Sequence, residues 1–542
     1  MRQESKSFTD RDLLWQTLER GDTEWDVVVV GGGIIGAGIL REAARRGLKA
    51  LLVEQRDFAS GTSSRSSKMV HGGLRYISHG DIALTRDSLR ERERLLREAP
   101  GLIDRMGYYF TLKKGQFPGR LPFGILLSLY DRLAGIKNHR FFDNAALQLQ
   151  FAGIGGERMN GAMYYTDTVT DDARLVLRVL QESIAAGGSA LNYVKAASLL
   201  KTSGQVNGVL LENAESGERV ELHCKSVISA TGAWADTLRN EVNAERRIRP
   251  LRGSHIVLPM AKLPVADALT LFHPEDKRPV FIFPWEGTTV VGTTDLDHTY
   301  GLDEEPVISQ QELDYLLGAV RALFPQQTFG REDIISTWSG VRPVIGSEKS
   351  RDPSKERRDH AVWSDHGLVT VSGGKLTTFR LIALDAINAA APEIAARAST
   401  EVDDRVFKAP DIEPEELAAL LPPQPGAEQN HARARRLIGR YGGHARRLLE
   451  EAPEAERAPI ENTSFCLAEC RWAAANESVV HLDDLLLRRT RLGALLERGG
   501  EALLPQLETL CAEALGWSAQ RWEQEVARYR EIWTKYYYLP RP

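Results

Sequence analysis

Three glycines near the start of the chain have the spacing of a dinucleotide-binding turn. The pattern Gly31-x-Gly33-x-x-Gly36 follows the apolar, β-branched run 26–30 and precedes an Ala-rich stretch with a helical pattern. In such a turn, Gly31 permits the tight bend, Gly33 lets the backbone approach a pyrophosphate, and Gly36 lets the helix pack closely on the sheet. The helix N-terminus then offers N–H groups and a partial positive charge to the phosphates.

An acidic residue stands where the ribose of a dinucleotide would need it. Glu54 ends a second apolar run, 50–53, so the strand–turn–helix–strand order is complete. This order predicts a Rossmann-type α/β domain in which Glu54 accepts hydrogen bonds from the adenosine ribose, with Ile34 and Ile35 in the first helical turn beside the phosphates. The pattern alone leaves FAD and NAD both open, and a purely structural glycine turn is the simpler alternative.

The remaining elements must position this turn and a substrate beside it. Short β-like runs recur at 226–232 and between 250 and 300, and the segment 81–98 has the pattern of a charged helix. The Pro-rich stretch 420–426 cannot continue a helix. Beyond it the chain is rich in Ala, Leu, Glu and Arg at helical spacing. We therefore expect a polar leader (1–24), an oxidoreductase region (25–400), a linker (401–426) and an all-α C-terminal domain (427–542).

Composition and charge exclude several classes of protein. The 542 residues are 42% hydrophobic and 26% charged with a formal net charge of −5, which argues against disorder and gives no basis for nucleic-acid binding. The four cysteines are sparse, which fits a reducing compartment and buried structural thiols, and no ligand spacing indicates a metal site. The polar leader lacks the apolar core of a secretory signal. The expected location is therefore the cytoplasm.

A series of motifs is similar to those of the FAD-dependent (aerobic, quinone-linked) glycerol-3-phosphate dehydrogenases. The most specific is the segment 59–76, ASGTSSRSSKMVHGGLRY. The resemblance continues in collinear order over about residues 24 to 390, through 171–175, 230–232, 253–257, 292–295, 339–343 and 373–380. It implies FAD as the cofactor and the architecture of amino-acid and sarcosine oxidases. There, FAD-binding segments (about 25–100, 165–240 and 335–395) alternate with segments of a mixed-sheet substrate domain (about 101–164 and 241–334).

The resemblance also implies which residues surround the cofactor. The helix start at 373–378 is expected to point its positive end at the flavin, where negative charge builds up on reduction. An ordinary glycine turn and helix cap is the alternative. The cofactor-binding residues expected from the motifs and the resemblance are Gly31, Gly33, Ile34, Ile35, Gly36, Glu54, Thr62, Ser63, Ser67, Lys68, His71, Gly72, Gly73, Ala230, Thr231, Gly232, Gly374, Lys375, Leu376 and Thr377.

The same resemblance implies a substrate site for glycerol 3-phosphate. Its phosphate needs cations, because Arg binds phosphate bidentately and Lys serves as a point charge. The substrate-binding residues that the family match implies are Arg75, Tyr76, Arg342, Lys375 and Arg358. Oxidation of a secondary alcohol also needs a proton acceptor, and His71 and His255 are joint candidates because imidazole titrates near neutral pH. Arg342 and Lys375 complete the expected catalytic set.

The motifs leave more than one electron acceptor and more than one kind of partner as alternatives. Related enzymes pass electrons to a quinone, whereas an oxidase of this family would use oxygen and an amine or amino-acid oxidase would bind a carboxylate instead. The apolar segment 121–130 has basic residues on both sides. It is too short to span a bilayer, so it indicates either a buried helix or a segment lying in the membrane interface. With the resemblance, we expect peripheral attachment through 119–137 to the inner face of the cell membrane. The helical C-terminal domain leaves a homodimer open.

Overall fold

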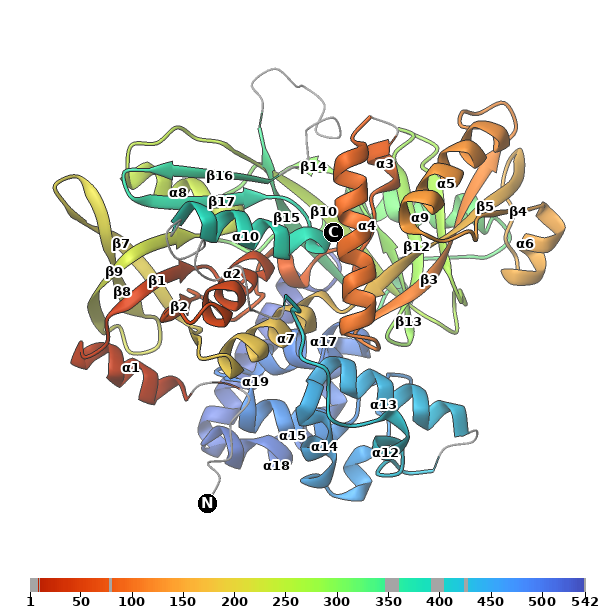
Figure 1. The fold of residues 1–542 in the computed structure, drawn as a ribbon. Helices are drawn as coiled ribbons and strands as arrows, with labels where there is room; N and C mark the ends of the chain where they lie inside the picture. The colour runs from red at the N-terminus through yellow and green to blue at the C-terminus, as the bar shows by residue number, and fades with distance from the viewer. Residues whose placement is uncertain are drawn as a thin grey trace.

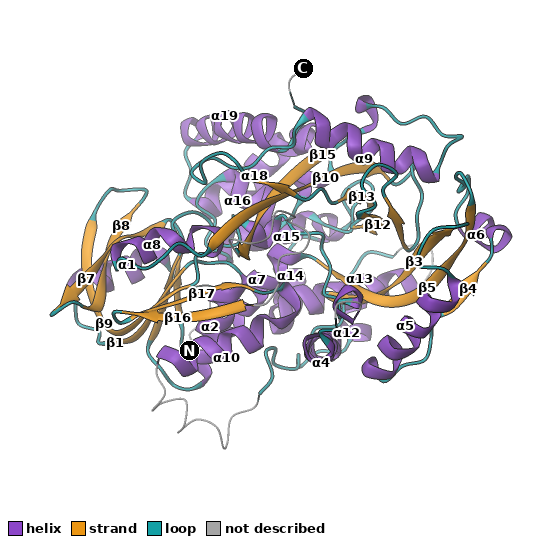
Figure 2. Cartoon of the chain, turned by 90° about the horizontal axis from the view of Figure 1, so that it is seen from above, coloured by secondary structure: helices purple, strands orange, loops and turns teal. Residues whose placement is uncertain are grey.

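The computed structural model describes residues 8, 10–77, 80–346, 360–390, 404–423 and 427–540. Two β-sheets lie at opposite sides of the molecule, and a group of C-terminal helices lies against both (Figure 1). Seen from above, the long strands β10 (Ile248–Pro259) and β15 (Ser336–Ile345) run between the two sides (Figure 2). The two sheets and the helical domain therefore meet near the centre of the molecule.

Sheet A is the predicted Rossmann-type sheet. Its parallel strands lie in the order β17-β9-β1-β2-β6, with β16 antiparallel at one edge and the hairpin β7–β8 joined to β9. The strands are β1 (Trp25–Val30), β2 (Ala50–Val53), β6 (Ser189–Leu191), β7 (Val194–Thr202), β8 (Gln205–Asn213), β9 (Arg219–Ser229), β16 (His360–Asp365) and β17 (Leu368–Gly373). The continuous valine run of β1 is apolar on both faces because both faces are covered.

Alternate residues of the parallel strands enter two different cores. Val27 and Val29 of β1 pack with the helices on one face, whereas Val28 and Val30 pack with those on the other. The first face carries α2 (Ile34–Arg45), α7 (Asp172–Ala185) and α10 (Phe379–Ala390). The second face carries α1 (Arg11–Arg20) and α8 (Ala235–Glu241). This two-residue period is the expected result of a pleated strand between two layers.

Sheet B is the mixed substrate sheet. Its order is β14-β10-β13-β12-β11-β3-β5-β4, with β15 paired to the other side of β10. The strands not yet given are β3 (Ile103–Lys113), β4 (Arg140–Phe142), β5 (Met159–Thr170), β11 (Ala268–Phe272), β12 (Pro279–Trp285), β13 (Thr288–Gly292) and β14 (Leu296–Asp297). The helices around it are α3 (Leu74–Ile77), α4 (Ile82–Glu98), α5 (Arg120–Ala134), α6 (Asn144–Gln150) and α9 (Gln310–Leu323).

The C-terminal helices form a domain with its own core that also extends the core of sheet B. They are α12 (Pro414–Ala418), α13 (Ala427–Tyr441), α14 (Ala445–Glu450), α15 (Leu467–Asn476), α16 (Leu482–Asp484), α17 (Leu492–Leu495), α18 (Leu504–Leu515) and α19 (Ala519–Tyr536). Residues of α15 to α19 share one buried cluster with Trp285 and Trp338 of sheet B. Cys466, Cys470 and Cys511 are buried free thiols in this domain. Among the described residues, no group of side chains has the makings of a metal site.

Several predicted boundaries differ from those of the structure. Strand β15 belongs to sheet B rather than to the FAD-binding segment 335–395, because its whole length pairs with β10. The described part of the predicted linker, 404–423, contains α12 and buries Val406 and Phe407 against sheet A. The predicted leader contains α1, whose Leu14, Trp15 and Leu18 are buried. Both segments are short and amphipathic, with charged residues on their exposed faces. Their composition alone therefore did not predict their buried residues.

Candidate active site

The glycine turn of sheet A has the cradle that a pyrophosphate requires. Gly31 has a φ of +114°, and a Cβ placed there would lie 2.6 Å from the carbonyl oxygen of Ala230. A Cβ on Gly36 would lie only 1.8 Å from the carbonyl oxygen of Gly31. Since both positions exclude every side chain, the turn can bring its backbone directly against a ligand.

Helix α2 presents its N-terminus at this turn. Its cap residue Gly33 makes no side-chain cap hydrogen bond, and its first turn contains no acidic residue. Ile34 N donates to Ser63 Oγ at 3.0 Å, whereas the N–H groups of Ile35 and Gly36 have no acceptor within the helix. The cradle and the positive end of the helix fit the phosphates of FAD.

Glu54 lies at the position that the Rossmann pattern assigns to the ribose contact. Its carboxylate accepts hydrogen bonds from Gly32 N at 2.7 Å and Arg56 N at 2.9 Å. Burial raises its pKa above the usual value, an effect that these two N–H groups oppose. The backbone thereby fixes the carboxylate next to the glycine turn.

The other predicted cofactor segments converge on the same edge of sheet A. Ala230 N donates to the carbonyl of Val30 at 2.8 Å, which sets the Ala230–Gly232 turn beside the glycine turn. Two other predicted cofactor segments meet at His71 and Thr377. His71 N donates to Thr377 Oγ1 at 3.0 Å, and Thr377 Oγ1 donates to the His71 carbonyl at 3.1 Å. Residues more than 300 positions apart are thus brought together.

A cavity of about 1310 Å³ lies between the two sheets and collects most of the remaining predicted residues. Phe117, Phe123 and Leu126 extend it toward α5. The predicted site residues that line it are Thr62, Ser67, His71, Gly73, Tyr76, His255, Arg342, Gly374, Lys375, Leu376 and Thr377. Gly374 and Thr377 come from the turn between β17 and α10, where the short helix Leu376–Thr378 precedes α10 as the sequence predicted.

Two cations in this cavity are held in place by neighbours. Arg342 donates from Nη1 to Asp295 Oδ1 at 3.2 Å and from Nη2 to Thr293 Oγ1 at 3.1 Å. Lys375 donates to Ser88 Oγ at 2.9 Å, and its Nζ lies 3.7 Å from the centre of the Tyr76 ring. Arg342 comes from sheet B and Lys375 from the end of sheet A, so the two cations line the cavity from different sheets.

His255 is the more buried of the two candidate bases. Its Nε2 is hydrogen-bonded to Ser67 Oγ at 2.9 Å, and its ring stacks on Trp338. Its Nδ1 has no hydrogen-bond partner among the described atoms. Burial, with Lys68 and Arg342 adding to it, lowers the pKa of His255 well below its usual range. The imidazole is therefore neutral at neutral pH.

Comparisons with known proteins agree with this geometry. Residues 26–380 match the family of FAD dependent oxidoreductases, and residues 381–522 match the C-terminal domain of alpha-glycerophosphate oxidase. A glycerol-3-phosphate dehydrogenase 2 of Mycobacterium tuberculosis is 35% identical over 536 residues, which cover 96% of this chain and 89% of the relative. An aerobic glycerol-3-phosphate dehydrogenase of Staphylococcus epidermidis is 33% identical, with 90% of each chain covered.

The chain belongs to the FAD-dependent glycerol-3-phosphate dehydrogenase family. FAD is its cofactor. The fold is also that of the solved glycerol-3-phosphate dehydrogenase of Bacillus halodurans, which is complexed with FAD. That structure has a TM-score of 0.76 and 24% sequence identity, and 98% of each chain is covered. The expected fold class of this family, a Rossmann-type FAD domain with a mixed-sheet substrate domain and a helical C-terminal domain, is confirmed.

The structure places Lys68, which was expected at the cofactor, away from the cavity. The ammonium of Lys68 is fully buried and binds both oxygens of Asp172, at 2.8 and 2.9 Å, and the carbonyl of Ser64 at 2.6 Å. Burial lowers the pKa of Lys68 to about 7, with the charge of Arg491 as the next cause. Its side chain thus holds the segment that carries Ser67 and does not line the cavity.

Two residues expected to bind substrate are not placed. Arg358 lies outside the described residues, and for Arg75 only the backbone, in α3, is described.

Three residues that line the cavity were not predicted from the sequence: Thr293, Asp295 and Arg278. Thr293 and Asp295 line the cavity and orient Arg342. They stand in the motif 292–295, which carried the resemblance but had no assigned role. Arg278 lines the cavity and donates to the carbonyl of Asp295. The available sequence signal for Thr293 and Asp295 was a short polar motif after a strand. This motif could not predict the contact with Arg342, because Arg342 is 47 positions from Asp295 along the chain.

Proposed function

We propose that this protein oxidises sn-glycerol 3-phosphate to dihydroxyacetone phosphate and passes the electrons to a membrane quinone. Membership of the family supports the reaction. The single observation that carries it is the cavity in which Arg342 and Lys375 stand together with residues 374–377, the strip expected to contact the flavin. An anionic alcohol bound by these cations lies beside the cofactor, which is the arrangement that hydride removal needs.

The substrate phosphate is bound by Arg342 and Lys375. A phosphate dianion prefers Arg for its paired donors, and Asp295 and Thr293 keep the Arg342 guanidinium in one orientation. Tyr76 packs its ring against the Lys375 ammonium and lines the same cavity. Arg75 and Arg358 remain proposed phosphate contacts from the family resemblance. Two cations around one substrate disfavour an amine or amino-acid oxidase, because a single carboxylate needs fewer.

The alcohol proton passes to a histidine. FAD, when bound, would supply the acceptor for the hydride that leaves the carbon bearing this hydroxyl. We favour His255 over His71, because the His255 ring is fixed by its hydrogen bond to Ser67, which lines the cavity beside it. His71 is tied through its backbone to Thr377 and stays the second candidate. The N-terminus of α10 and its preceding turn add a positive end near this site.

The proposed membrane contact is α5. One face of this helix is packed, with Phe123, Leu127 and Tyr130 buried. Its other face exposes apolar residues at four-residue spacing: Leu121 is 80% exposed and Ile125 is 73% exposed, and Leu129 continues the row. Helix α5 is therefore neither a fully buried helix nor an ordinary polar surface helix, and its exposed row supports a position in the bilayer interface.

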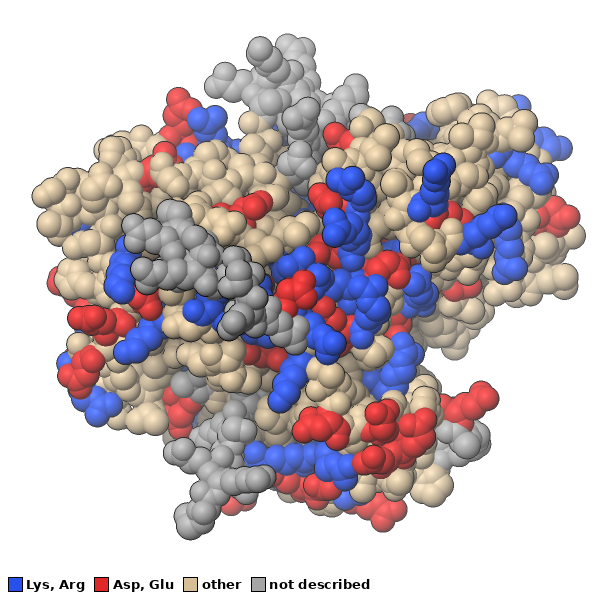
Figure 3. All heavy atoms as spheres, in the orientation of Figure 1, with Lys and Arg blue, Asp and Glu red and all other residues tan. Residues whose placement is uncertain are grey.

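Basic side chains flank the proposed contact. Lys and Arg, with Asp and Glu among them, gather over α4 and the neighbouring end of α5 on the face drawn in Figure 3. Arg90, Arg94 and Arg97 of α4, Arg132 of α5 and Arg380 line a hollow of about 460 Å³ there, together with three carboxylates, Asp87, Glu91 and Glu93. Such cations favour an anionic lipid surface. In the described chain, no helix is both long and apolar enough to cross a membrane.

A glycerol-3-phosphate oxidase that uses oxygen is the second candidate. It is favoured by the match of residues 381–522 to the C-terminal domain of alpha-glycerophosphate oxidase. Both candidates share the substrate and the first half of the reaction and differ only in what reoxidises the flavin.

An anaerobic titration tests the proposal. The purified protein is mixed with sn-glycerol 3-phosphate, glycerol or sarcosine, and the flavin absorbance is followed. We expect bleaching by glycerol 3-phosphate alone; an unchanged spectrum with that substrate, or bleaching by sarcosine, would refute the reaction. Air is then admitted to the reduced protein, or a soluble quinone analogue is added without air. Fast reoxidation by the quinone and slow reoxidation by air would support the dehydrogenase, and the reverse would support the oxidase.

A further inference from the structure

The segment 483–490 joins the helical domain to the FAD-binding sheet. It forms the end of α16 and a π-helical turn, Leu485–Arg489, at the boundary between the two. Arg489 is fully buried and donates from Nη1 to Asp57 Oδ2 at 2.6 Å and from Nη2 to Asp57 Oδ1 at 2.8 Å. A guanidinium bound to both oxygens of one carboxylate fixes orientation as well as distance.

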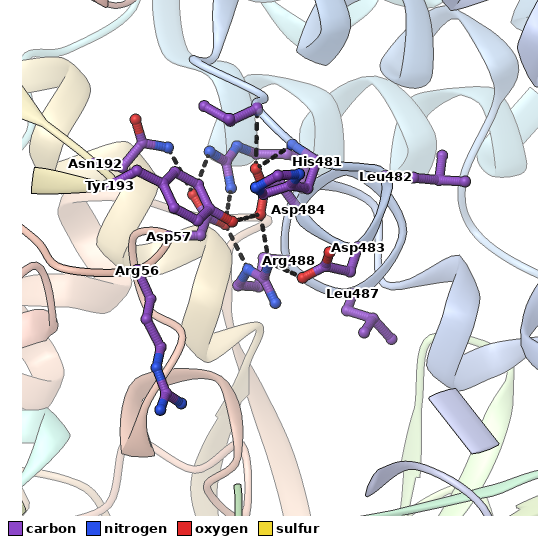
Figure 4. Close-up of polar contacts among 12 residues, drawn as sticks. Arg56, Asp57, Asn192, Tyr193, His481, Leu482, Asp483, Asp484, Leu487 and Arg488 are labelled. Atoms are coloured by element: carbon purple, nitrogen blue, oxygen red, sulfur yellow. Dashed lines mark hydrogen bonds and ion pairs between the residues drawn. The ribbon is translucent and has the colours of Figure 1, made fainter. Parts of the chain in front are cut away.

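Asp57 is held from several sides. Arg488 Nε donates to its Oδ2, and Asn192 Nδ2 donates to its Oδ1 at 3.0 Å (Figure 4). Burial acts to raise the pKa of Asp57, but the charges of Arg489 and Arg488 outweigh it and hold that pKa well below its usual value. The carboxylate is therefore ionised in the folded protein, and its position follows that of the helical domain.

Asp57 begins a tight turn whose backbone is hydrogen-bonded to the glycine turn. Ser60 N donates to the carbonyl of Asp57 at 3.1 Å, and Ala59 N donates to the carbonyl of Gly32 at 3.0 Å. Ala59 has a φ of +61°, a left-handed conformation that costs a non-glycine residue energy and needs support from its surroundings. The turn that begins at Asp57 is thus a strained piece of backbone packed on the glycine turn.

A second arginine of the helical domain holds the other end of this segment. Arg491 donates from Nη2 to the carbonyl of Ser64 at 2.6 Å. Between Asp57 and Ser64 lie Thr62 and Ser63, two predicted cofactor contacts, and Ser63 accepts from the N-terminus of α2. The helical domain is therefore hydrogen-bonded to both ends of the segment 57–64, at Asp57 and at Ser64.

A third link holds the strand beside Asp57. Tyr193 OH donates to Asp484 Oδ1 at 2.7 Å (Figure 4), and Tyr193 N donates to the carbonyl of Arg56 at 2.9 Å. Asp484 is itself fixed by the N–H groups of Val480 and His481. The same stretch of the helical domain thus contacts the residues on both sides of the ribose-binding Glu54 turn.

We propose that the C-terminal helical domain is a cofactor clamp, in which Arg489 and Arg491 are positioning residues that hold the segment 57–64 in its FAD-binding conformation. The segment contains strained and polar backbone, and an untethered loop would have to be ordered each time FAD binds. The two arginines act through Asp57 and Ser64 and not by contact with the flavin. The inference rests on the use of FAD and is independent of the substrate and the electron acceptor.

The test compares two equally buried ion pairs between the same domains. Arg489→Lys keeps the charge but removes the paired donors to Asp57. The matched control is Arg174→Lys, because Arg174 pairs with Glu477 of the helical domain through two bonds of 2.7 Å and is as buried. Arg174 touches Arg489 only at its main-chain carbonyl, at 3.0 Å, and does not touch the segment 57–64. The holoenzyme of each variant is diluted, and FAD release is followed by the rise in flavin fluorescence, together with the Tm.

We expect Arg489→Lys to release FAD at least about 10-fold faster than the wild type, and Arg174→Lys to lower the Tm without changing the release rate. Equal release rates in both variants, or an unchanged rate in Arg489→Lys, would overturn the clamp. If Arg489→Lys does not fold, Arg491→Lys decides. It removes the paired donors to the carbonyls of Ser64 and Leu487 and keeps the positive charge that faces Asp171 and Asp172. Faster FAD release in that variant supports the proposal, and wild-type release contradicts it.

Discussion

Arg342 Nη1 lies 3.2 Å from Asp295 Oδ1, across the gap between β15 and the turn that follows β13. The pair leaves the guanidinium lining the cavity, with Thr293 Oγ1 as a second support at 3.1 Å. A cation oriented in this way can bind a substrate phosphate without first losing rotamer freedom.

Replacement of Arg342 should weaken substrate binding much more than it affects the cofactor. We expect Arg342→Met to raise the KM for glycerol 3-phosphate about 100-fold, because a charge-assisted hydrogen bond contributes about 1.5–3 kcal/mol. The FAD content, measured by absorbance, should stay that of the wild type. Arg249→Met is the control, since Arg249 is paired with Asp297 on the neighbouring strand but does not line the cavity. A KM near the wild-type value in Arg342→Met would remove Arg342 from the site.

His255→Asn should slow the reductive half-reaction. Loss of the proton acceptor should lower the rate of flavin reduction by about 10²–10⁴-fold, the usual contribution of a general base. Stopped-flow absorbance measures this rate. The control His444→Asn removes another histidine that packs on a tryptophan, Trp472, in the helical domain. If His71→Asn alone produced the large loss, the base would be His71.

The lowered pKa of His255 also sets a direction for pH dependence. Because the folded protein keeps the imidazole neutral, acidification from pH 8 to 6.5 should cause no loss of flavin reduction through His255. The unfolded chain takes up this proton near the ordinary pKa, so the folded state loses stability as the pH falls below about 6.5. The Tm of the wild type should therefore fall more steeply between pH 6.5 and 5.5 than that of His255→Asn. Parallel curves would contradict the assignment.

Gly36→Ala should abolish stable FAD binding. The added methyl would stand 1.8 Å from the carbonyl of Gly31, so the turn must open. We expect at least about a 10-fold lower FAD content after purification, because the phosphates lose their cradle. Gly301→Ala is the control, as a Cβ there meets open space. Full FAD content in Gly36→Ala would place the pyrophosphate elsewhere.

Two acidic substitutions on α5 test the membrane contact. Leu121→Glu with Ile125→Glu should lower partition onto vesicles containing anionic lipid by at least about 10-fold, because each buried apolar side chain contributes about 1.5–3 kcal/mol. Sedimentation with the vesicles measures the bound fraction. Leu149→Glu on α6 is a matched control, since Leu149 is 91% exposed but lies on another helix. Undiminished sedimentation of the double variant would rule out α5 as the contact.

Lys68→Met should act on stability before it acts on the cofactor. Removal of the ammonium leaves Asp172 buried without its main partner, a change that costs about 3–5 kcal/mol. We expect a lower Tm with FAD still bound in the purified protein. The double variant Lys68→Met with Asp172→Leu should recover part of the loss. FAD loss at an unchanged Tm would instead support the direct cofactor contact that the sequence predicted.

The sequence by itself determined the nucleotide turn and the order of elements around it. Gly31, Gly33 and Gly36 carry their meaning locally, since a missing Cβ and a neighbouring strand and helix are enough to define the turn. The continuous valine run of β1 likewise indicated a strand buried on both faces. The family motifs named the histidines and cations of the site, and His255, Arg342 and Lys375 do line one cavity.

Only the tertiary structure decided where the long cations point. Lys68 and Lys375 both stand in family motifs, but Lys68 finds Asp172 104 positions away and is buried, whereas Lys375 reaches the cavity. The same holds for Arg489, whose partner Asp57 is 432 positions away. A charged side chain goes where distant elements supply its counter-charge, and the local sequence carries no record of which distant carboxylate folding will bring within reach.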